Sequence, residues 1–187
     1  MRLLSCVLFL STVGIVAAAD EFKLESGYKL LFNGKNLDGW QTKAAKDGKP
    51  ESLEGKTEAY EGRFKVKDGE LTFDPKVKGD KYIETVAPVG GDFTVRFDFK
   101  PDDKCNNDLL FLVTKFDIKV GAKDAIKGVK VDEWNKMEIT VKAGAVEYKV
   151  NGEVAGTAKT KGDKGPFTIR AEFGGIIIKN MRITDGK

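Results

Sequence analysis

Apolar and polar residues alternate along much of the chain in short runs, and Gly, Asp, Asn or Pro residues separate these runs. In residues 92–99, DFTVRFDF, every second position is apolar, from Phe93 to Phe99. A period of two residues places these side chains on one face of a β-strand. Residues 109–113, LLFLV, are apolar throughout, which is typical of a strand buried on both faces. After residue 19, no segment has the long periodicity of an amphipathic helix.

Turn signals join these runs into pairs. Asp68-Gly69 lies between RFKV (63–66) and ELTF (70–73), and an Asp-Gly pair in this position is a strong signal for a β-hairpin. Similar signals at 143–144, 151–152 and 174–175 separate the runs 134–141, 145–150, 153–154, 167–173 and 176–183. About ten short strands with turns roughly every 8 to 12 residues predict an antiparallel β-sandwich. The alternation in 176–183, IIIKNMRI, is imperfect, so the core-facing side of that strand stays open.

Two polar stretches interrupt this pattern. Residues 41–62 are rich in Lys, Glu and Gly and are predicted to form a long surface excursion. Such a loop on a sandwich either shapes a binding face or has no role, and both alternatives stay open. Residues 119–130 are similarly polar and are predicted to link two strands.

The first residues have the pattern of a targeting segment. Met1-Arg2 precedes an apolar run from Leu3 to Val16 and three alanines that end at Ala19. This order predicts a secretory signal peptide over 1–19, cut after Ala19, and a single mature domain over 20–187. A membrane anchor is the alternative, but the run is shorter than the roughly 20 residues that a span requires. We therefore expect a secreted or periplasmic protein that has no integral membrane span after signal cleavage.

Charge and composition exclude several classes of function. Without Arg2, 31 of the 32 basic residues remain against 29 acidic ones, and the lysines are scattered between acids. Nucleic-acid binding needs clustered positive charge, so no nucleic-acid partner is expected. The sequence contains no histidine, which excludes Ser-His-Asp and Cys-His catalysis and His-ligated zinc. Cys105 is the single cysteine after the signal, and we expect a half-buried thiol that is not a nucleophile.

Five segments, in order, resemble the motifs of the 3-keto-disaccharide hydrolase domain family. They are LFNGKNLDGW (31–40), KVKDGELTF (65–73), GDFTVRFDFKPDD (91–103), VDEWNKMEITVKAGAVEYKVNGE (131–153) and GPFTIRAEFGGIIIKNMRI (165–183). Together they span nearly all of the mature chain. The resemblance implies an all-β fold, a concanavalin A-like jelly-roll β-sandwich of two curved antiparallel sheets with a groove on the concave face.

The resemblance also implies a chemistry. Family members act on glycosides whose sugar carries a ketone at C3, and this ketone acidifies the proton at C2. A base removes that proton, the aglycone leaves by elimination, and water adds back to the product. The reaction needs a general base and a cation or metal ion that polarises the ketone. No particular cofactor follows from the sequence, and a divalent metal is one option for the polarising group.

Four charged residues match polar positions of the family's groove strands. FDIKV (116–120) resembles a strand that carries Glu and Gln, which are replaced here by Asp117 and Lys119. RAEF (170–173) resembles a Gln-Asp-His-Gly motif, with Arg170 at its start and Glu172 where the histidine would stand. Alternate residues of a strand point to one side, so each pair shares a face. The resemblance implies that Asp117 or Glu172 is the catalytic base and that Lys119 or Arg170 is its electrophilic partner. A salt-bridge network without catalysis is the alternative.

Substrate-binding candidates come from the same resemblance. CNNDLLFL (105–112) resembles a strand that carries polar groups into the groove, with Asn106 retained, Asn107 in place of a serine and Leu112 in place of an arginine. Glu84 aligns with the polar end of another strand and either contacts the ligand or is an exposed strand-end residue. Oxygen-bearing side chains at 102–103 and 106–108 leave two options, an acidic turn or a calcium-binding turn, although they match no specific loop spacing.

The two tryptophans, Trp40 and Trp134, are expected in the core, with sugar stacking as the alternative for Trp40. The sequence thus predicts an exported single-domain protein that binds a carbohydrate on a concave sheet. The specific hypothesis is a hydrolase or lyase that cleaves a 3-keto-glycoside by carboxylate-assisted proton abstraction at C2. The alternatives are a non-catalytic carbohydrate-binding module and an envelope interaction protein on the same scaffold.

Overall fold

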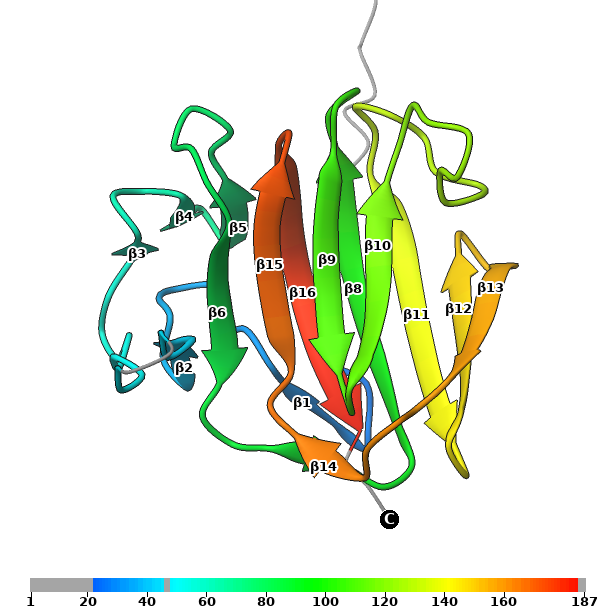
Figure 1. Cartoon of the computed structure of the whole chain (residues 1–187). Helices are drawn as coiled ribbons and strands as arrows, with labels where there is room; N and C mark the ends of the chain where they lie inside the picture. Colours follow the sequence, from blue (N-terminus) through cyan, green and yellow to red (C-terminus); the bar gives the residue numbers. More distant parts are fainter. Residues whose placement is uncertain (1–21, 46–47, 185–187) are drawn as a thin grey trace, which may run out of the picture.

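The structure is a computed structural model that describes residues 22–45 and 48–184 (Figure 1). The described residues form β-strands joined by turns and loops, so the predicted all-β sandwich of antiparallel sheets is confirmed. The predicted signal peptide over 1–19 lies outside the described residues. No helix within the described part of the chain is long and apolar enough to cross a membrane.

Two antiparallel sheets make up the sandwich. The larger has nine strands in the order β13-β12-β11-β8-β16-β5-β4-β3, with β1 paired to β16. Its strands are β1 (Tyr28–Leu30), β3 (Glu58–Ala59), β4 (Phe64–Lys67), β5 (Glu70–Phe73), β8 (Phe93–Pro101), β11 (Asn135–Lys142), β12 (Ala145–Val150), β13 (Glu153–Lys159) and β16 (Ile176–Thr184).

The smaller sheet has five strands in the order β10-β9-β15-β6-β2. Its strands are β2 (Trp40–Thr42), β6 (Lys81–Thr85), β9 (Asn106–Phe111), β10 (Thr114–Lys119) and β15 (Thr168–Phe173). A short pair, β7 (Val89–Gly90) with β14 (Lys164–Gly165), lies at one end of the sandwich (Figure 1).

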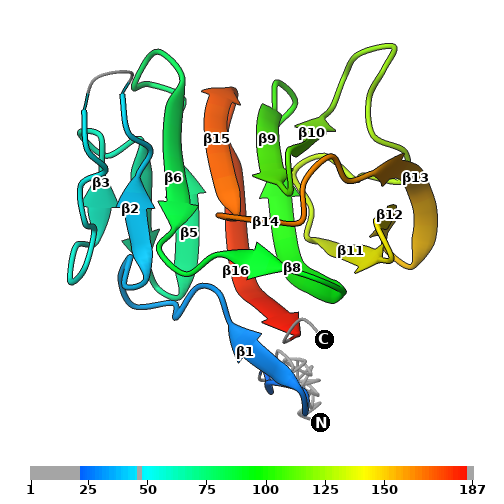
Figure 2. The ribbon, with the colours of Figure 1, turned by 60° about the horizontal axis from the view of Figure 1, so that its bottom comes forward.

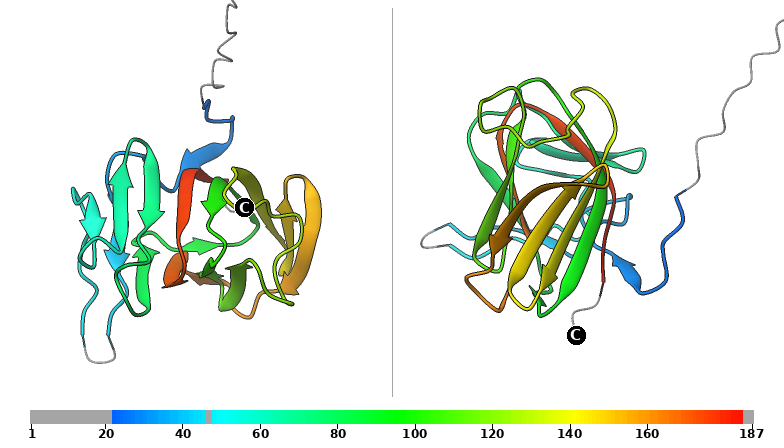
Figure 3. Two further views of the ribbon diagram at one scale, coloured as in Figure 1. Left: turned by 90° about the horizontal axis from the view of Figure 1, so that it is seen from above. Right: turned by 90° about the vertical axis from the view of Figure 1, so that its right-hand side faces the viewer.

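The two sheets face each other as layers. In Figure 1, β6, β15, β9 and β10 lie in front of the larger sheet, and Figure 3 shows the same two layers from above and from the side. At one end of the larger sheet, β11, β12 and β13 curl round toward β10 (Figure 2). The stacked rings of Phe116 on β10 and Tyr148 on β12, with centroids 3.9 Å apart, join the layers there. The larger sheet therefore wraps around one edge of the smaller one.

The core lies between the layers and follows the alternation of the sequence. Phe93, Val95, Phe97 and Phe99 of β8 are all buried, as the pattern of residues 92–99 predicts. Across the core, buried side chains of the smaller sheet meet them, and the Phe93 and Phe111 rings lie 6.0 Å apart. Full burial of one such side chain contributes about 1.5–3 kcal/mol of hydrophobic free energy.

The predicted hairpins are also present. β4 pairs with β5 around Asp68-Gly69, β11 pairs with β12 around residues 143–144, and β12 pairs with β13 around residues 151–152. The strand predicted over 109–113 is different, because β9 ends at Phe111. Leu112 and Val113 form the two-residue turn to β10, with φ angles of 47° and 58°. Both are in the left-handed region that this type of hairpin requires.

A β-bulge in β16 explains the imperfect alternation of residues 176–183. The register with β8 shifts between Lys179 and Arg182, and Asn180 has a φ of 56°. The extra residue changes the parity of the strand. As a result, Ile176 and Ile178 before the bulge and Met181 after it are all buried.

The chain changes sheets between its last two strands. β15 pairs with β6 and β9, whereas β16 pairs with β5 and β8 in the opposite layer, so Gly174 and Gly175 form a crossing and not a hairpin. Gly174 has a φ of 68°, and a Cβ atom there would lie 2.4 Å from the backbone of Lys104. Only glycine fits this close approach.

The two tryptophans have different environments. Trp40 on β2 is 1% exposed, and its indole Nε1 donates a hydrogen bond of 2.8 Å to the Leu31 carbonyl, which confirms the core prediction. Trp134 is 38% exposed, and the Lys179 Nζ lies 3.8 Å from its ring centroid, so the core prediction is wrong for this residue. Its neighbour Asn135 is the buried residue at the start of β11, where its side chain bonds the backbone of Lys130.

Two further predictions are refined. The excursion over 41–62 is anchored by Leu53, which is buried, and by the short strand β3. Cys105 is fully buried and not half-buried, and its Sγ contacts the Ile118 carbonyl at 3.3 Å. Burial raises the pKa of the Cys105 thiol to about 12, which agrees with the prediction that it is not a nucleophile.

Candidate functional site

Charged side chains form a row across the outer face of the five-stranded sheet. Along β9, β10 and β15, successive residues face the core and the outer surface in turn, and the charged residues of these strands face outward. The register places Asp108 opposite Asp117 of β10 on one side and opposite Arg170 of β15 on the other. These three side chains therefore come from three neighbouring strands at one level of the sheet.

Asp108 lies at the base of this row. Its side chain has no exposed surface, and its Oδ2 accepts a hydrogen bond of 2.6 Å from Arg170 Nη1. The ammonium of Lys115 lies 3.3 Å from the same oxygen. The other oxygen, Oδ1, is buried, and no described residue donates a hydrogen bond to it. Burial of a carboxylate oxygen that receives no hydrogen bond is costly for the charged form of Asp108 and favours its protonated form.

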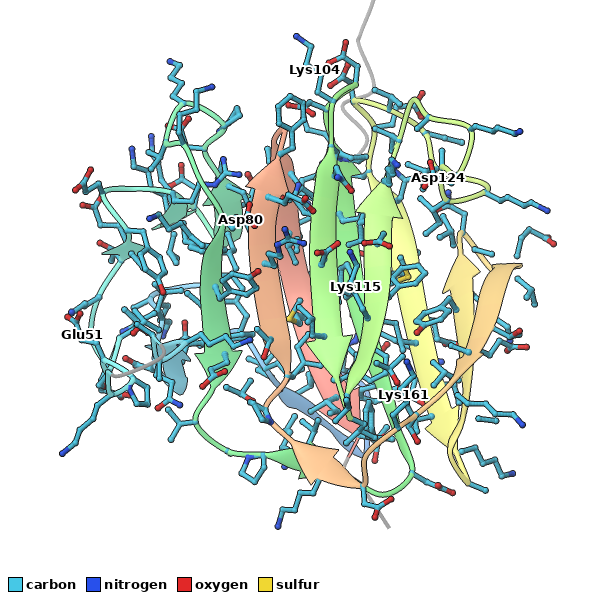
Figure 4. All side chains as sticks on the ribbon, in the orientation of Figure 1. Glu51, Asp80, Lys104, Lys115, Asp124 and Lys161 are labelled. Atoms are coloured by element: carbon cyan, nitrogen blue, oxygen red, sulfur yellow. The ribbon has the colours of Figure 1, made fainter. Side chains whose placement is uncertain are left out.

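Lys115 and Asp117 form the exposed part of the row. Lys115 Nζ lies 2.6 Å from Asp117 Oδ1, and the two side chains are 46% and 48% exposed. Figure 4 shows Lys115 in the middle of the front sheet. A carboxylate and an ammonium group are thus held side by side where a ligand from solvent can reach both.

Arg170 connects the acids on the other side of the row. Its Nη1 lies 3.0 Å from Glu172 Oε2, and its Nη2 donates a hydrogen bond of 2.5 Å to Asp80 Oδ2. Its guanidinium also lies 5.7 Å from the centroid of the Tyr82 ring. Burial opposes the charge of Arg170, but its hydrogen bonds to Asp80 and Asp108 outweigh this effect and raise its pKa. Arg170 is therefore a fixed cation that holds three carboxylates in place.

The two aspartates of the row have pKa values that are displaced in opposite directions. Burial, followed by the hydrogen bond with Asp117, raises the pKa of Asp108 to about 6. Burial also works against the charge of Asp117, but hydrogen bonds from Asp108 and Lys115 lower its pKa overall. Two neighbouring carboxyl groups whose pKa values differ in this way are suited to act as an acid and a base.

The structure brings together three of the four predicted catalytic residues. Asp117, Arg170 and Glu172 all belong to the row. Lys119 shares the outer face of β10, but its Nζ pairs with Asp124 at 2.8 Å, away from the row. Figure 4 shows Asp124 in the loop beside β10 and Asp80 on the opposite side of the sheet.

The predicted substrate-binding residues do not all lie on the same face of the sheet. Asn106 and Glu84 lie on the outer face of β9 and β6, and Glu84 Oε1 accepts a hydrogen bond of 3.1 Å from Gln41. Asn107 faces the core and is 1% exposed, and its Oδ1 accepts a bond from the Glu172 amide. Asn107 is therefore a structural residue that cannot contact a ligand on the outer face.

The calcium-binding turn is not present. Residues 106–108 are part of β9 and not of a turn. Asp102 instead fixes the backbone of the sheet crossing, because its Oδ2 accepts a bond of 2.6 Å from the Gly175 amide. Over residues 22–45 and 48–184, no group of three or more His, Cys, Asp or Glu side chains is arranged to hold a metal ion.

Lys115 and Asp80 are site residues that the sequence analysis does not propose as functional, and Asp108 enters it only as a member of the calcium-binding turn option. Lys115 has the same parity on its strand as Asp117, and Asp108 has the same parity as Asn106, so the alternation places both on the outer face. Asp80 lies in the loop before β6, and no sequence signal relates it to Arg170.

Comparison with known proteins places the chain in a family. Residues 27–129 match the model of the 3-keto-alpha-glucoside-1,2-lyase-like domain. The chain belongs to this family. The match includes β9 and β10 with Asp108, Lys115 and Asp117, whereas Arg170 and Glu172 follow its last residue. No curated protein matches the chain at a significant level.

Solved structures confirm the fold. A candidate glycosyl hydrolase from Parabacteroides distasonis has a TM-score of 0.63 and 20% identity, and the alignment covers 86% of this chain and 94% of that one. The Bacillus subtilis carbohydrate-binding module CBM66 has a TM-score of 0.51 and 14% identity, with 84% and 100% of the two chains covered. The exoplasmic domain of VIP36, solved with Ca2+ and Man3GlcNAc, has a TM-score of 0.59 and 8% identity, with 89% and 91% covered. At these low identities the structural similarity shows the fold alone, a concanavalin A-like sandwich.

Proposed function

We propose that the protein cleaves a 3-keto-glycoside on the outer face of its five-stranded sheet, with Asp117 as the base and Lys115 as the electrophilic partner. The observation that carries this proposal is the 2.6 Å separation of Asp117 Oδ1 and Lys115 Nζ, both on exposed side chains. The reacting C2–H and the C3 ketone oxygen are neighbours in the sugar. One carboxylate and one adjacent cation therefore match the two groups that the reaction must address.

The proposed steps follow from this arrangement. Asp117 accepts the C2 proton, and the electrons of the C2–H bond pass to the C3 oxygen as an enolate. Lys115 stabilises the charge on that oxygen. The electrons then return, the C1–O bond breaks, and the aglycone oxygen takes up a proton as a C1=C2 double bond forms. Water adds across that bond to give the free 3-keto sugar.

The remaining residues of the row have supporting roles in this proposal. Arg170 holds the carboxylates of Asp108 and Glu172 in place. The hydrogen bond between Asp108 and Asp117 helps to keep the pKa of Asp117 low. Lys115 replaces Lys119 and Arg170 as the proposed electrophile, because Lys119 is paired with Asp124 and Arg170 is occupied by three carboxylates. Family membership and the sugar-related names of the structural relatives support a carbohydrate substrate.

The test is turnover of a 3-keto-glucoside, measured as release of the aglycone. We expect the wild-type protein to be active, and we expect Asp117→Asn to lose roughly 100-fold or more of the rate, because a general base typically contributes that much. Asp124→Asn is the matched control, since it removes the same charge from the neighbouring loop. Equal rates for D117N and D124N would exclude Asp117 as the base.

A non-catalytic carbohydrate-binding module is the second candidate function. The observation in its favour is that Arg170 already pairs with Asp80, Asp108 and Glu172. Much of the charge in the row is therefore neutralised by pairs within the row. Glycan binding by the wild-type protein without any release of aglycone would favour this candidate. We also propose export of the protein, on the basis of the signal pattern over residues 1–19.

A further inference from the structure

A cavity of about 550 Å³ lies on the outer face of the nine-stranded sheet, which is the opposite side of the sandwich from Asp117. Side chains of β8, β11, β12 and β16 form its floor, and Phe22 and Glu25 of the N-terminal segment form a wall. The volume is within the range of roughly 300–1,000 Å³ that is usual for small-molecule sites.

The β-bulge of β16 shapes the floor of this cavity. Because of the bulge, the consecutive residues Lys179 and Asn180 both lie outside the core, and Asn180 lines the cavity. Asn180 Nδ2 donates a hydrogen bond of 2.7 Å to Asp98 Oδ2 on the neighbouring strand. This bond orients both side chains, and among the described residues nothing donates to Asp98 Oδ1 or Asn180 Oδ1. Two fixed acceptor oxygens therefore remain for a ligand that has hydroxyl donors.

Most of the other charges in the cavity are already paired. Glu25 accepts hydrogen bonds of 2.5 Å and 2.6 Å from Arg182, and these hold the pKa of Glu25 at about 2. Arg96 pairs with Glu138 at 2.6 Å, and Lys149 lies 3.9 Å from the same carboxylate. Because of these pairs, the rim of the cavity carries little net charge.

Lys136 is the exception. It lines the cavity, its side chain is exposed, and its ammonium makes no ion pair within the described part of the chain. The register places Lys136 directly opposite Asp98 on β8. One cation thus stands beside two acceptor oxygens, with the exposed ring of Phe22 on the wall.

We propose that this cavity binds a sugar acid of the hexuronate type. The ligand carboxylate pairs with Lys136, its hydroxyl groups donate to Asp98 Oδ1 and Asn180 Oδ1, and an apolar face of its ring packs against Phe22. A hexuronate has one anionic group, several hydroxyl donors and a small apolar face. The cation, the acceptor oxygens and the aromatic ring of the cavity complement these three features. The site is separate from the row on the five-stranded sheet and does not depend on the proposed catalysis.

The test is an NMR titration of the full chain with three probes, glucuronate, glucose and acetate. We expect glucuronate to bind most tightly and to shift the backbone amides of Asp98, Lys136 and Asn180, but not those of Asp108 and Arg170. Lys136→Gln should weaken glucuronate binding about tenfold or more, because it removes a charge-assisted hydrogen bond.

Lys142→Gln is the matched control, since Lys142 is an exposed lysine of the same strand and does not line the cavity. This variant should bind glucuronate as the wild-type protein does. The proposal is overturned if glucuronate does not bind, if acetate or glucose binds equally well, if K136Q and K142Q lose affinity equally, or if the shifts appear only on the five-stranded sheet. Unchanged thermal unfolding of both variants excludes misfolding as the cause of a loss.

Discussion

Replacement of Asp108 with asparagine removes a buried negative charge from the row and keeps the shape of the side chain. The Asp108 side chain has no exposed surface, and burial and its bond with Asp117 raise its pKa from 3.8 to about 6. Asparagine resembles the protonated acid, because its oxygen accepts from Arg170 and its amide group donates toward Asp117. We therefore expect D108N to change the pH dependence of stability.

The sign and the size of this change follow from the two pKa values. The folded protein keeps the Asp108 proton up to about pH 6, whereas the unfolded chain releases it near pH 3.8. Between these values the folded state binds more protons, so the free energy of unfolding falls as the pH rises. A difference of about two pKa units corresponds to on the order of 3 kcal/mol. The lowered pKa of Asp117 has the opposite effect, but it acts below the ordinary pKa of an aspartate, outside this window.

The assay is urea unfolding of both proteins at several values between about pH 4 and about pH 7. We expect the stability advantage of D108N over the wild-type protein to grow by on the order of 3 kcal/mol across this range. Asp80→Asn is the control, because Asp80 bonds the same Arg170 but is 45% exposed, and it should keep the wild-type slope. Parallel pH profiles for D108N and the wild-type protein would refute this reasoning.

Three further substitutions test the packing by thermal or urea unfolding. Tyr148→Phe should leave stability unchanged or raise it by about 1 kcal/mol, because the Tyr148 hydroxyl is buried and no described residue bonds to it; a large loss would show a missing partner. Val113→Gly should stabilise the protein by about 1 kcal/mol, since Val113 has a φ of 58° and is 73% exposed; a loss would show that its contacts outweigh the strain. Trp40→Phe should cost about 2–4 kcal/mol, because it leaves a void and an unbonded Leu31 carbonyl, and a neutral effect would contradict the core position of Trp40.

Local patterns predicted most of the strands. The alternation over 92–99 and the turn at Asp68-Gly69 were sufficient for β8 and for the β4–β5 hairpin, because both depend on neighbouring residues. Strand 176–183 needed more, since only the register with β8 shows that Asn180 is an inserted residue. The crossing between sheets at Gly174 could not be predicted either. Two strand-like runs on either side of a glycine pair have the same sequence pattern whether the strands pair with each other or lie in different sheets.

Only part of the arrangement of the candidate site could be predicted, for similar reasons. Parity indicated only that Asp117 shares a face with Lys119 and that Arg170 shares a face with Glu172. The register of three strands then brings Asp117 and Arg170 to Asp108. Lys119 has the same parity as Asp117 but lies two residues further along β10, where its ammonium pairs with Asp124 and not with the row. Asn107 was misjudged because a polar residue at an inward position resembles a ligand-binding residue until its core partners are known.

The central claim, that Asp117 and Lys115 form a proton-abstracting pair, is tested most directly by hydrogen exchange at C2 of a 3-keto-glucoside in D2O. The account predicts that the wild-type protein accelerates loss of the C2 proton signal. It also predicts that D117N slows this loss by roughly 100-fold or more, while D124N behaves as the wild-type protein does. Exchange that is no faster with the protein than in buffer, or that is equal in D117N and D124N, would contradict the claim.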